Sequence, residues 1–185
     1  MKKILLQSLL LNNFFLPIYG ASPDPVFGQN GMVVSTSKQA SEAGISILKK
    51  DGNAIDAAVA VGFALAVTSS GNGNLGGGGF LVASFADGNS ITLDHREKAP
   101  LKSHRDMFLS DTGTVIPGMS LYSNASSGVP GTVDGLIKAF EDYGSGKISL
   151  KQVLAPAIKL AEKGFLLSHY EAKRFNQYKK FFEEN

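Results

Sequence analysis

Apolar residues recur at helical spacing through the first half of the chain. Residues 38–50 place alanine, isoleucine and leucine three and four positions apart, with Ser37 as a candidate N-cap and Gly52 just past the end, which predicts a helix. Residues 53–70 are apolar on every side, which predicts a second helix that is buried nearly all round. Asp56 lies near the start of that helix, where a carboxylate interacts favourably with the helix dipole; a functional role for it stays open.

The second half of the chain carries three more helical patterns. The first covers about residues 132–143, and the next begins after Ser149 and ends at Gly164. Residues 169–185 are amphipathic, with aromatic and basic side chains. This pattern predicts a helix with a solvated face over packed aromatic residues, rather than a nucleic-acid surface. Residues 106–120, which precede these helices, lack a regular pattern and are predicted to be a loop.

Three stretches have the branched or alternating pattern of β-strands. Met32–Thr36 is short and β-branched, and residues 79–85 and 90–94 lie on either side of Asp87 and Gly88. An Asp-Gly pair between two strand patterns is a hairpin signal. The sequence therefore predicts one isolated strand and one hairpin.

A glycine-rich stretch, GNGNLGGGGF at Gly71–Phe80, joins the second helix to the hairpin. It lacks the Lys-Ser or Lys-Thr of a P-loop. A helix precedes it and a strand follows, the reverse of a dinucleotide-binding turn. Glycine here either lets the helix and the strand approach closely or leaves backbone amides open to a ligand. The sequence leaves both interpretations open.

The first 21 residues have the pattern of a secretory signal peptide. Lys2 and Lys3 precede an apolar stretch, and small residues follow at positions 20–22. We expect residues 1–21 to be removed on export, and residues 22–185 to form a periplasmic or secreted domain without a stable membrane anchor. An uncleaved N-terminal anchor is the alternative.

Charge and composition narrow the classes of function. The 185 residues carry 18 basic and 16 acidic side chains, and the leader holds two of the lysines and no acid. The mature chain is therefore near neutral, which argues against nucleic acid as a main partner. The chain has no cysteine, which excludes a cysteine nucleophile. The histidines lack the spacing of a zinc site, so we expect no metal and no cofactor; His95 and His169 are predicted to be surface or interface residues.

The polar stretch HREKAP, residues 95–100, follows the hairpin directly. Its Arg96 stands at a strand end beside the glycine-rich stretch, a place where an arginine fork can bind a carboxylate. The alternative is a surface ion pair between Arg96 and Glu97 or Asp94.

Four blocks of sequence, in this order, resemble the gamma-glutamyltranspeptidase family, also called glutathione hydrolases. They are DGNAIDAAVAVGFAL at Asp51–Leu65, GNLGGGGF at Gly73–Phe80, REKAP at Arg96–Pro100 and SGVPGTVDGL at Ser127–Leu136. The agreement extends from about Gly31 to Gly164.

The resemblance implies an α+β fold. Residues 22–185 would form the N-terminal part of the large subunit of an N-terminal nucleophile (Ntn) hydrolase, an αββα four-layer sandwich that is incomplete in this chain. Such a precursor cuts itself into two subunits, and the enzyme cleaves the γ-glutamyl amide of glutathione and other γ-glutamyl compounds. The γ-glutamyl group passes to water, amino acids or peptides. The resemblance implies that Arg96 binds the substrate's α-carboxylate and that a threonine of the small catalytic subunit is the nucleophile.

The sequence departs from the family pattern in two ways. It contains no Thr-Thr-His, the context of the family's catalytic threonine, so no residue of this chain is assigned as catalytic and the chain alone is expected to be inactive. His95 replaces the residue, usually apolar, that precedes the family arginine. The alternative function is a non-catalytic exported remnant, or a binding partner of a separately encoded catalytic half.

Overall fold

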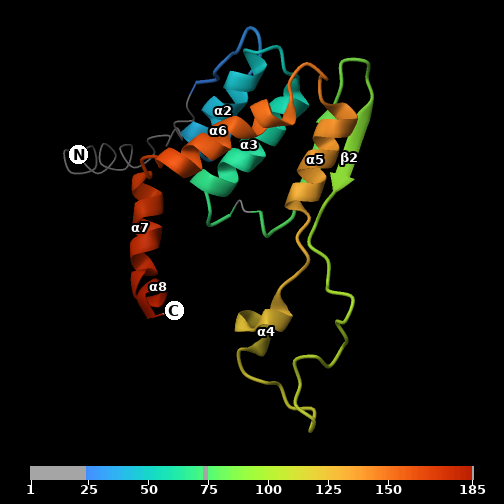
Figure 1. Ribbon diagram of the computed structural model, residues 1–185, viewed down its shortest axis with the longest axis vertical. Helices are drawn as coiled ribbons and strands as arrows, with labels where there is room; N and C mark the ends of the chain where they lie inside the picture. The colour runs from blue at the N-terminus through green and yellow to red at the C-terminus, as the bar shows by residue number, and fades with distance from the viewer. Residues whose placement is uncertain (1–23, 73–74, 185) are drawn as a thin grey trace, which may run out of the picture. The chain divides into compact units, whose positions relative to one another are not determined.

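The computed structural model describes residues 24–72 and 75–184 (Figure 1). The chain divides into two compact units, Met1–Asn30 and Gly31–Asn185. In the first unit, the described residues carry no helix or strand. The signal peptide predicted at residues 1–21 lies outside the described residues. Within the described ranges, no helix is both long and apolar enough to cross a membrane.

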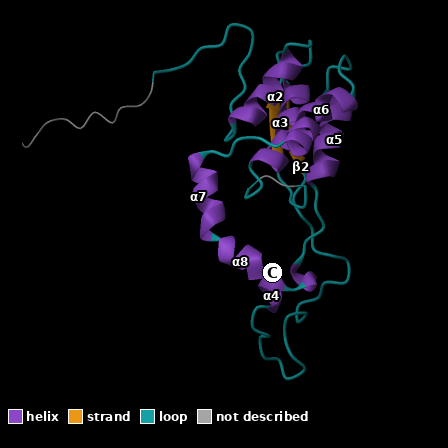
Figure 2. Ribbon diagram, turned by 60° about the vertical axis from the view of Figure 1, so that its left-hand side comes forward, coloured by secondary structure: helices purple, strands orange, loops and turns teal. Residues whose placement is uncertain are grey.

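The second unit combines helices with one β-hairpin (Figure 2). Its elements in chain order are α2 (Lys38–Leu48), α3 (Ala54–Thr68), β1 (Phe80–Ser84), β2 (Ser90–Asp94), α4 (Met119–Tyr122), the 3₁₀ helix η2 (Asn124–Ser126), α5 (Thr132–Tyr143), α6 (Leu150–Lys163), α7 (His169–Gln177) and α8 (Lys179–Glu184). The helices predicted around α2, α3, α5 and α6 and the predicted hairpin are therefore confirmed.

Side-chain caps fix where helices α2 and α6 begin. The Ser37 hydroxyl accepts a hydrogen bond from the Ala40 backbone N–H at the start of α2. At the start of α6, Ser149 and Gln152 form a reciprocal capping box, in which each side chain accepts from the other residue's backbone N–H. Both serines were expected as caps from the sequence, and both expectations are confirmed. α6 ends at Gly164, as predicted.

Helix α3 lies at the centre of the core and packs against α2, α5 and α6 (Figure 1). The buried apolar cluster draws on all four helices: Ala40, Ala43, Ile47, Ile55, Val59, Ala60, Phe63, Ala64, Leu136, Ala139, Ile148, Val153 and Ala157. The prediction that α3 is buried nearly all round is wrong along one strip. Ala58, Gly62 and Leu65 line an open cavity instead, and Ala58 is exposed.

The two strands pair antiparallel, and within the described residues they form a two-stranded sheet. β2 runs beside α5 in both views (Figures 1 and 2). The pairing places Phe80 opposite Asp94 and Leu81 opposite Leu93. Leu81 and Leu93 pack on the core cluster, whereas Phe80 and Val82 point away and are 66% and 75% exposed. One face of the hairpin is therefore half-buried against the core, and the other is exposed and carries Phe80 and Val82 among polar side chains.

The predicted strand at Met32–Thr36 is wrong, because this stretch has no regular secondary structure. A strand needs a neighbouring strand for its backbone hydrogen bonds, and none is recorded for it among the described residues. The side chain of Val33 instead packs on α2 at Gly44, where a Cβ would lie 2.9 Å from Val33 Cγ1.

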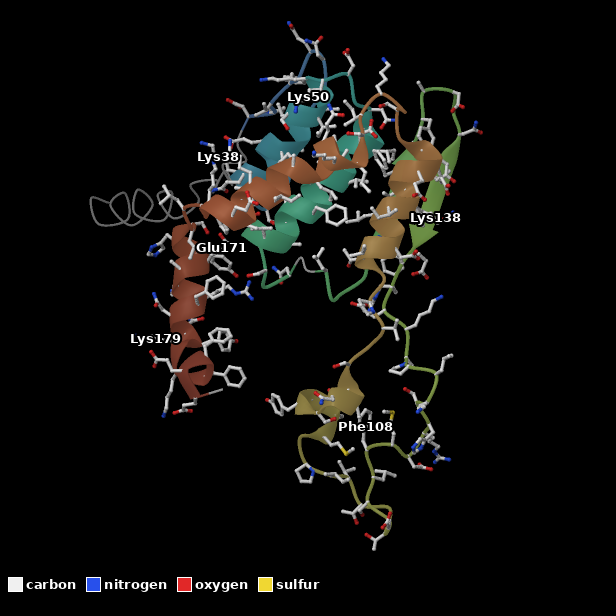
Figure 3. All side chains as sticks on the ribbon, viewed as in Figure 1. Lys38, Lys50, Phe108, Lys138, Glu171 and Lys179 are labelled. Atoms are coloured by element: carbon white, nitrogen blue, oxygen red, sulfur yellow. The ribbon has the colours of Figure 1, made fainter. Side chains whose placement is uncertain are left out.

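The final predicted helix is two helices, α7 and α8, separated at Tyr178. Ser168 and Glu171 form a capping box at the start of α7, where Figure 3 labels Glu171. The prediction of packed aromatic residues is wrong here. The aromatic side chains of both helices are between 43% and 68% exposed, namely Tyr170, Phe175, Tyr178, Phe181 and Phe182. Several of them line an open cavity of about 400 Å³ together with residues 69–72.

Candidate functional site

The segment that carries Arg96 begins where β2 leaves the hairpin. His95 continues the hairpin ladder: its N–H donates to the Gly79 carbonyl at 3.0 Å, and the Gly79 N–H donates to the His95 carbonyl at 3.3 Å. At the next residue, the backbone N–H of Arg96 donates a hydrogen bond to the side-chain oxygen Oδ1 of Asp94 at 3.0 Å. The backbone at Arg96 is therefore held by the strand pairing of the residue before it and by the hydrogen bond from its own N–H to the Asp94 carboxylate.

Three stretches that are distant in sequence meet through their backbones at this point. Residues 77–79 contact residues 95–98, and residues 128–132 contact both. The hydrogen bonds that join them run from Gly131 N and Thr132 N to Gly77 O at 2.9 and 3.0 Å, from Lys98 N to Val129 O at 3.1 Å and from Val129 N to Lys98 O at 2.8 Å.

The glycines allow this close approach. A Cβ on Gly78 would lie 2.6 Å from both the Glu97 nitrogen and the His95 carbonyl oxygen, and a Cβ on Gly131 would collide with the same carbonyl. These neighbours are backbone atoms, so they cannot rotate away as a flexible side chain could. A packing role is therefore confirmed for Gly78, although the backbone that it approaches is that of residues 95–97 and not the preceding helix. The second interpretation, backbone amides open to a ligand, stays a prediction.

The Arg96 side chain lies at the surface beside Glu97. Its Nε donates to Glu97 Oε2 at 2.8 Å, its guanidinium carbon lies 5.7 Å from the centre of the Phe80 ring, and the side chain is 59% exposed. The surface ion pair with Glu97, one of the two interpretations drawn from the sequence, is present. It does not exclude the other: Glu97 uses Nε, so a second carboxylate can accept two hydrogen bonds from the Nη1 and Nη2 edge.

The Arg96–Glu97 ion pair also shifts the pKa of both side chains. The hydrogen bond from Arg96 is the main reason that the pKa of the Glu97 carboxyl is lowered, and backbone N–H groups, including that of Gly78, lower it further. In return the hydrogen bond to Glu97 raises the pKa of Arg96. Glu97 is therefore ionised at neutral pH and remains an acceptor for the guanidinium.

An open cavity of about 500 Å³ lies beside this segment. Its lining includes His95, Glu97, Phe80 and Thr132, together with three residues of α3, namely Ala58, Gly62 and Leu65. Arg96 is not among the lining residues that the structure describes. Phe80 links the two features, because its ring lies under the guanidinium and also lines the cavity.

The histidines differ from one another in their surroundings. His169 is exposed, as predicted. His95, predicted to be a surface or interface residue, is not freely exposed: its side chain is half-buried, and its Nδ1 is buried without a hydrogen-bond partner among the described residues. The reason lies on α5, where Gly135 faces the imidazole without a side chain of its own. The spacing of Gly131 and Gly135, one helical turn apart, is the signal in the sequence that indicates this close approach.

Asp56 is placed in a structural position. It forms a capping box with Asn53 at the start of α3 and is fully buried. Oδ2 accepts from the Asn53 N–H at 2.9 Å and from the Ser145 N–H at 3.1 Å. The carboxylate therefore joins the start of α3 to the turn that follows α5.

Known proteins share this arrangement. The gamma-glutamyltranspeptidase family model matches residues 40–185. Glutathione hydrolase proenzymes from Pseudomonas sp. (strain A14) and Escherichia coli (strain K12) are 50% and 48% identical over 150 and 153 residues. Each alignment covers 81% of this chain and 26% of the relative. The chain thus spans about a quarter of the length of these curated relatives.

The likeness extends to three dimensions. The crystal structure of Helicobacter pylori gamma-glutamyltranspeptidase superposes with a TM-score of 0.81 and 43% identity, over 88% of this chain and 46% of that one. The predicted fold class is confirmed: the helices and the hairpin are part of the Ntn-hydrolase fold of these proteins. The family model, the curated relatives and the superposed fold agree, and the chain belongs to the gamma-glutamyltranspeptidase family.

Proposed function

We propose that this chain is the N-terminal part of the large subunit of a gamma-glutamyltransferase, or glutathione hydrolase. The whole enzyme cleaves the γ-glutamyl amide of glutathione and related compounds and passes the γ-glutamyl group to water, an amino acid or a peptide. The relatives named above are glutathione hydrolase proenzymes, and membership of their family supports this activity.

The observation that carries the proposal for this chain is the geometry of Arg96. Its backbone is fixed at the end of β2, its Nε is occupied by Glu97, and its guanidinium rests near the Phe80 ring. The Nη1 and Nη2 edge is then presented as a fork of the kind that binds carboxylates in two parallel hydrogen bonds. We assign Arg96 to the α-carboxylate of the γ-glutamyl substrate.

The chemistry itself is assigned to the small catalytic subunit, because these 185 residues contain no Thr-Thr-His. The hydroxyl oxygen of its first threonine attacks the γ-amide carbon, and the threonine's free amine takes the proton. The C–N bond breaks, the amine product leaves with a proton, and water or an acceptor amine releases the acyl group. Arg96 contributes by holding the far end of the substrate, so that the amide carbon lies within reach of the nucleophile.

The proposal has consequences for the chain by itself. Without a nucleophile, the 185-residue chain should not turn over a chromogenic γ-glutamyl anilide above a heat-killed control. We also propose that it is exported to the periplasm or medium with residues 1–21 removed. The intact mass of the exported product tests this, and a mass that still includes Met1 contradicts it.

The test of the assignment uses a completed enzyme, in which this chain is joined to the remainder of the E. coli glutathione hydrolase proenzyme. Arg96→Ala should lower kcat/KM for γ-glutamyl substrates by about tenfold to a few hundredfold, the equivalent of roughly 1.5–3 kcal/mol for a charge-assisted contact. Arg96→Lys keeps the charge but loses the planar fork, so it should also be impaired.

The matched control is Arg105→Ala. Arg105 is also paired with the carboxylate of the next residue, at 3.8 Å, but its side chain is 95% exposed in the loop after the site. Self-cleavage should survive in every variant, because that step acts on the chain's own peptide bond and needs no free α-carboxylate. An Arg96→Ala enzyme that matures and keeps the kcat/KM of the Arg105→Ala control would refute the assignment.

A further inference from the structure

The imidazole of His95 lies between two glycines that come from different elements. On one side its Cε1 faces Gly79, where an added Cβ would lie 2.9 Å away. On the other side its Cγ and Cδ2 face Gly135 of α5, where an added Cβ would collide with the ring. Neither neighbour has a side chain, so the ring itself fills the space between the end of the hairpin and α5.

The backbone of His95 is held at the same place. It exchanges two hydrogen bonds with Gly79, and its carbonyl lies against Gly131 and Gly78. Arg96 follows immediately, and its own side chain is 59% exposed, with Glu97 and Phe80 as its contacts. The exposed guanidinium therefore depends for its position on the half-buried residue before it.

We propose that His95 is a positioning residue for Arg96, and that it acts through the size of its ring. The inference rests on the proposed function, because it concerns the same carboxylate-binding site. The ring sets the distance between the start of β1 and α5. This distance in turn fixes the direction in which the Arg96 side chain points from the backbone. Removing the ring leaves a void that two glycines cannot fill, and the 95–97 segment gains freedom to shift.

Within the described residues, the unpaired Nδ1 indicates that no hydrogen bond through this atom holds the ring in place. Nδ1 has no hydrogen-bond partner among the described residues, and a buried polar atom without a partner is unfavourable. A functional hydrogen bond through this atom is therefore not what holds the ring in place. An apolar ring of similar size should do the same work without the unpaired nitrogen. His95 also lines the open cavity beside the site, which gives the slightly longer phenylalanine ring space to extend.

The experiment compares three variants in the completed enzyme. His95→Ala should raise KM for a γ-glutamyl anilide by about tenfold, because a small displacement of a binding group weakens substrate binding, while kcat changes much less. His95→Phe should restore KM to within about twofold of the unsubstituted enzyme and melt at the same temperature or higher. His169→Ala is the matched control, since His169 is exposed on α7, and it should change neither constant.

A second measurement on the 185-residue chain does not depend on activity. The Arg96 Nε–H group donates to Glu97, so its side-chain ¹H–¹⁵N signal reports whether the guanidinium stays in place. His95→Ala should shift or broaden this signal, whereas His95→Phe and His169→Ala should leave it sharp and close to its original position.

The outcomes separate the inference from the function on which it rests. If the unsubstituted completed enzyme does not turn over γ-glutamyl substrate, the proposed function fails. If that enzyme is active and needs Arg96, but His95→Ala keeps its KM, the inference fails alone. It also fails if His95→Phe raises KM as much as His95→Ala, or if His95→Ala lowers only kcat and the yield of folded protein, as a merely structural residue would.

Discussion

Replacing Asp56 with alanine tests how the buried start of α3 is held. The carboxylate is fully buried, and it accepts from the backbone N–H groups of Asn53 at 2.9 Å and of Ser145 at 3.1 Å. Alanine removes the acceptor of both hydrogen bonds at once. Two backbone donors, one at the start of α3 and one after α5, are then left without this partner.

The expected loss follows from these contacts. A hydrogen bond to a charged acceptor contributes about 1.5–3 kcal/mol, and a helix cap about 0.5–2 kcal/mol. Part of this gain is offset by the cost of burying the carboxylate, and water can reach the half-buried donors in the variant. We therefore expect Asp56→Ala to lower the free energy of unfolding by roughly 3 kcal/mol, a large fraction of the 5–15 kcal/mol typical of a domain.

The assay is urea unfolding of the chain, followed by far-ultraviolet circular dichroism. The matched control is Asp134→Ala, because Asp134 is also the third residue of its helix, α5, but is exposed and makes no capping hydrogen bond. It interacts with the helix dipole and, across the exposed surface of α5, with the charge of Lys138, so its removal should cost no more than about 0.5–1 kcal/mol. Equal midpoints for the two variants would show that the buried contacts of Asp56 do not stabilise the fold.

Two further predictions concern the segment around Arg96. Gly78→Ala should lower the free energy of unfolding by about 1–3 kcal/mol, because its Cβ would lie 2.6 Å from the backbone nitrogen of Glu97. Gly128→Ala should cost less in the same urea experiment, because its Cβ would lie 3.2 Å from the Glu97 side chain and 3.5 Å from the Lys98 carbonyl oxygen. In an NMR titration, Arg96→Ala should raise the pKa of Glu97 toward its ordinary value of 4.5, because the main cause of its lowering is lost. With Arg96 present, the stabilisation from this pair is complete above the unfolded-state pKa of Glu97 and is lost as the pH falls through its lowered folded-state pKa. A Glu97 pKa that does not respond to Arg96→Ala would contradict the pairing.

Much of the helical framework could be predicted from sequence because its signals are local. Ser37 and Ser149 cap the helices that they precede, and Gly164 ends α6, since each acts within one turn of its own helix. The strand predicted at Met32–Thr36 failed for the opposite reason. A strand is defined by a partner, and the sequence of one strand does not say whether a partner lies beside it.

The position of Arg96 at a strand end could be predicted from sequence, whereas the contacts around it could not. The charge pattern and the strand end pointed to Arg96, while the choice of Glu97 as the acceptor for Nε depends on side-chain directions that only the structure supplies. The burial of His95 depends on Gly79 and Gly135, which lie 16 and 40 positions away in sequence and meet it only in the folded chain. Contacts between distant backbones, rather than local propensity, decide such positions.

The central claim is that Arg96 binds the α-carboxylate of the substrate. Its most direct test removes the Arg96 guanidinium and the charge of the α-carboxylate, separately and together. The completed enzyme and its Arg96→Ala variant would each be assayed with a γ-glutamyl anilide and with the α-methyl ester of the same anilide. The unsubstituted enzyme should prefer the free acid by about tenfold to a few hundredfold in kcat/KM, and Arg96→Ala should lose most of this preference because its partner is gone. An Arg96→Ala enzyme that discriminates against the ester as strongly as the unsubstituted enzyme would contradict the claim.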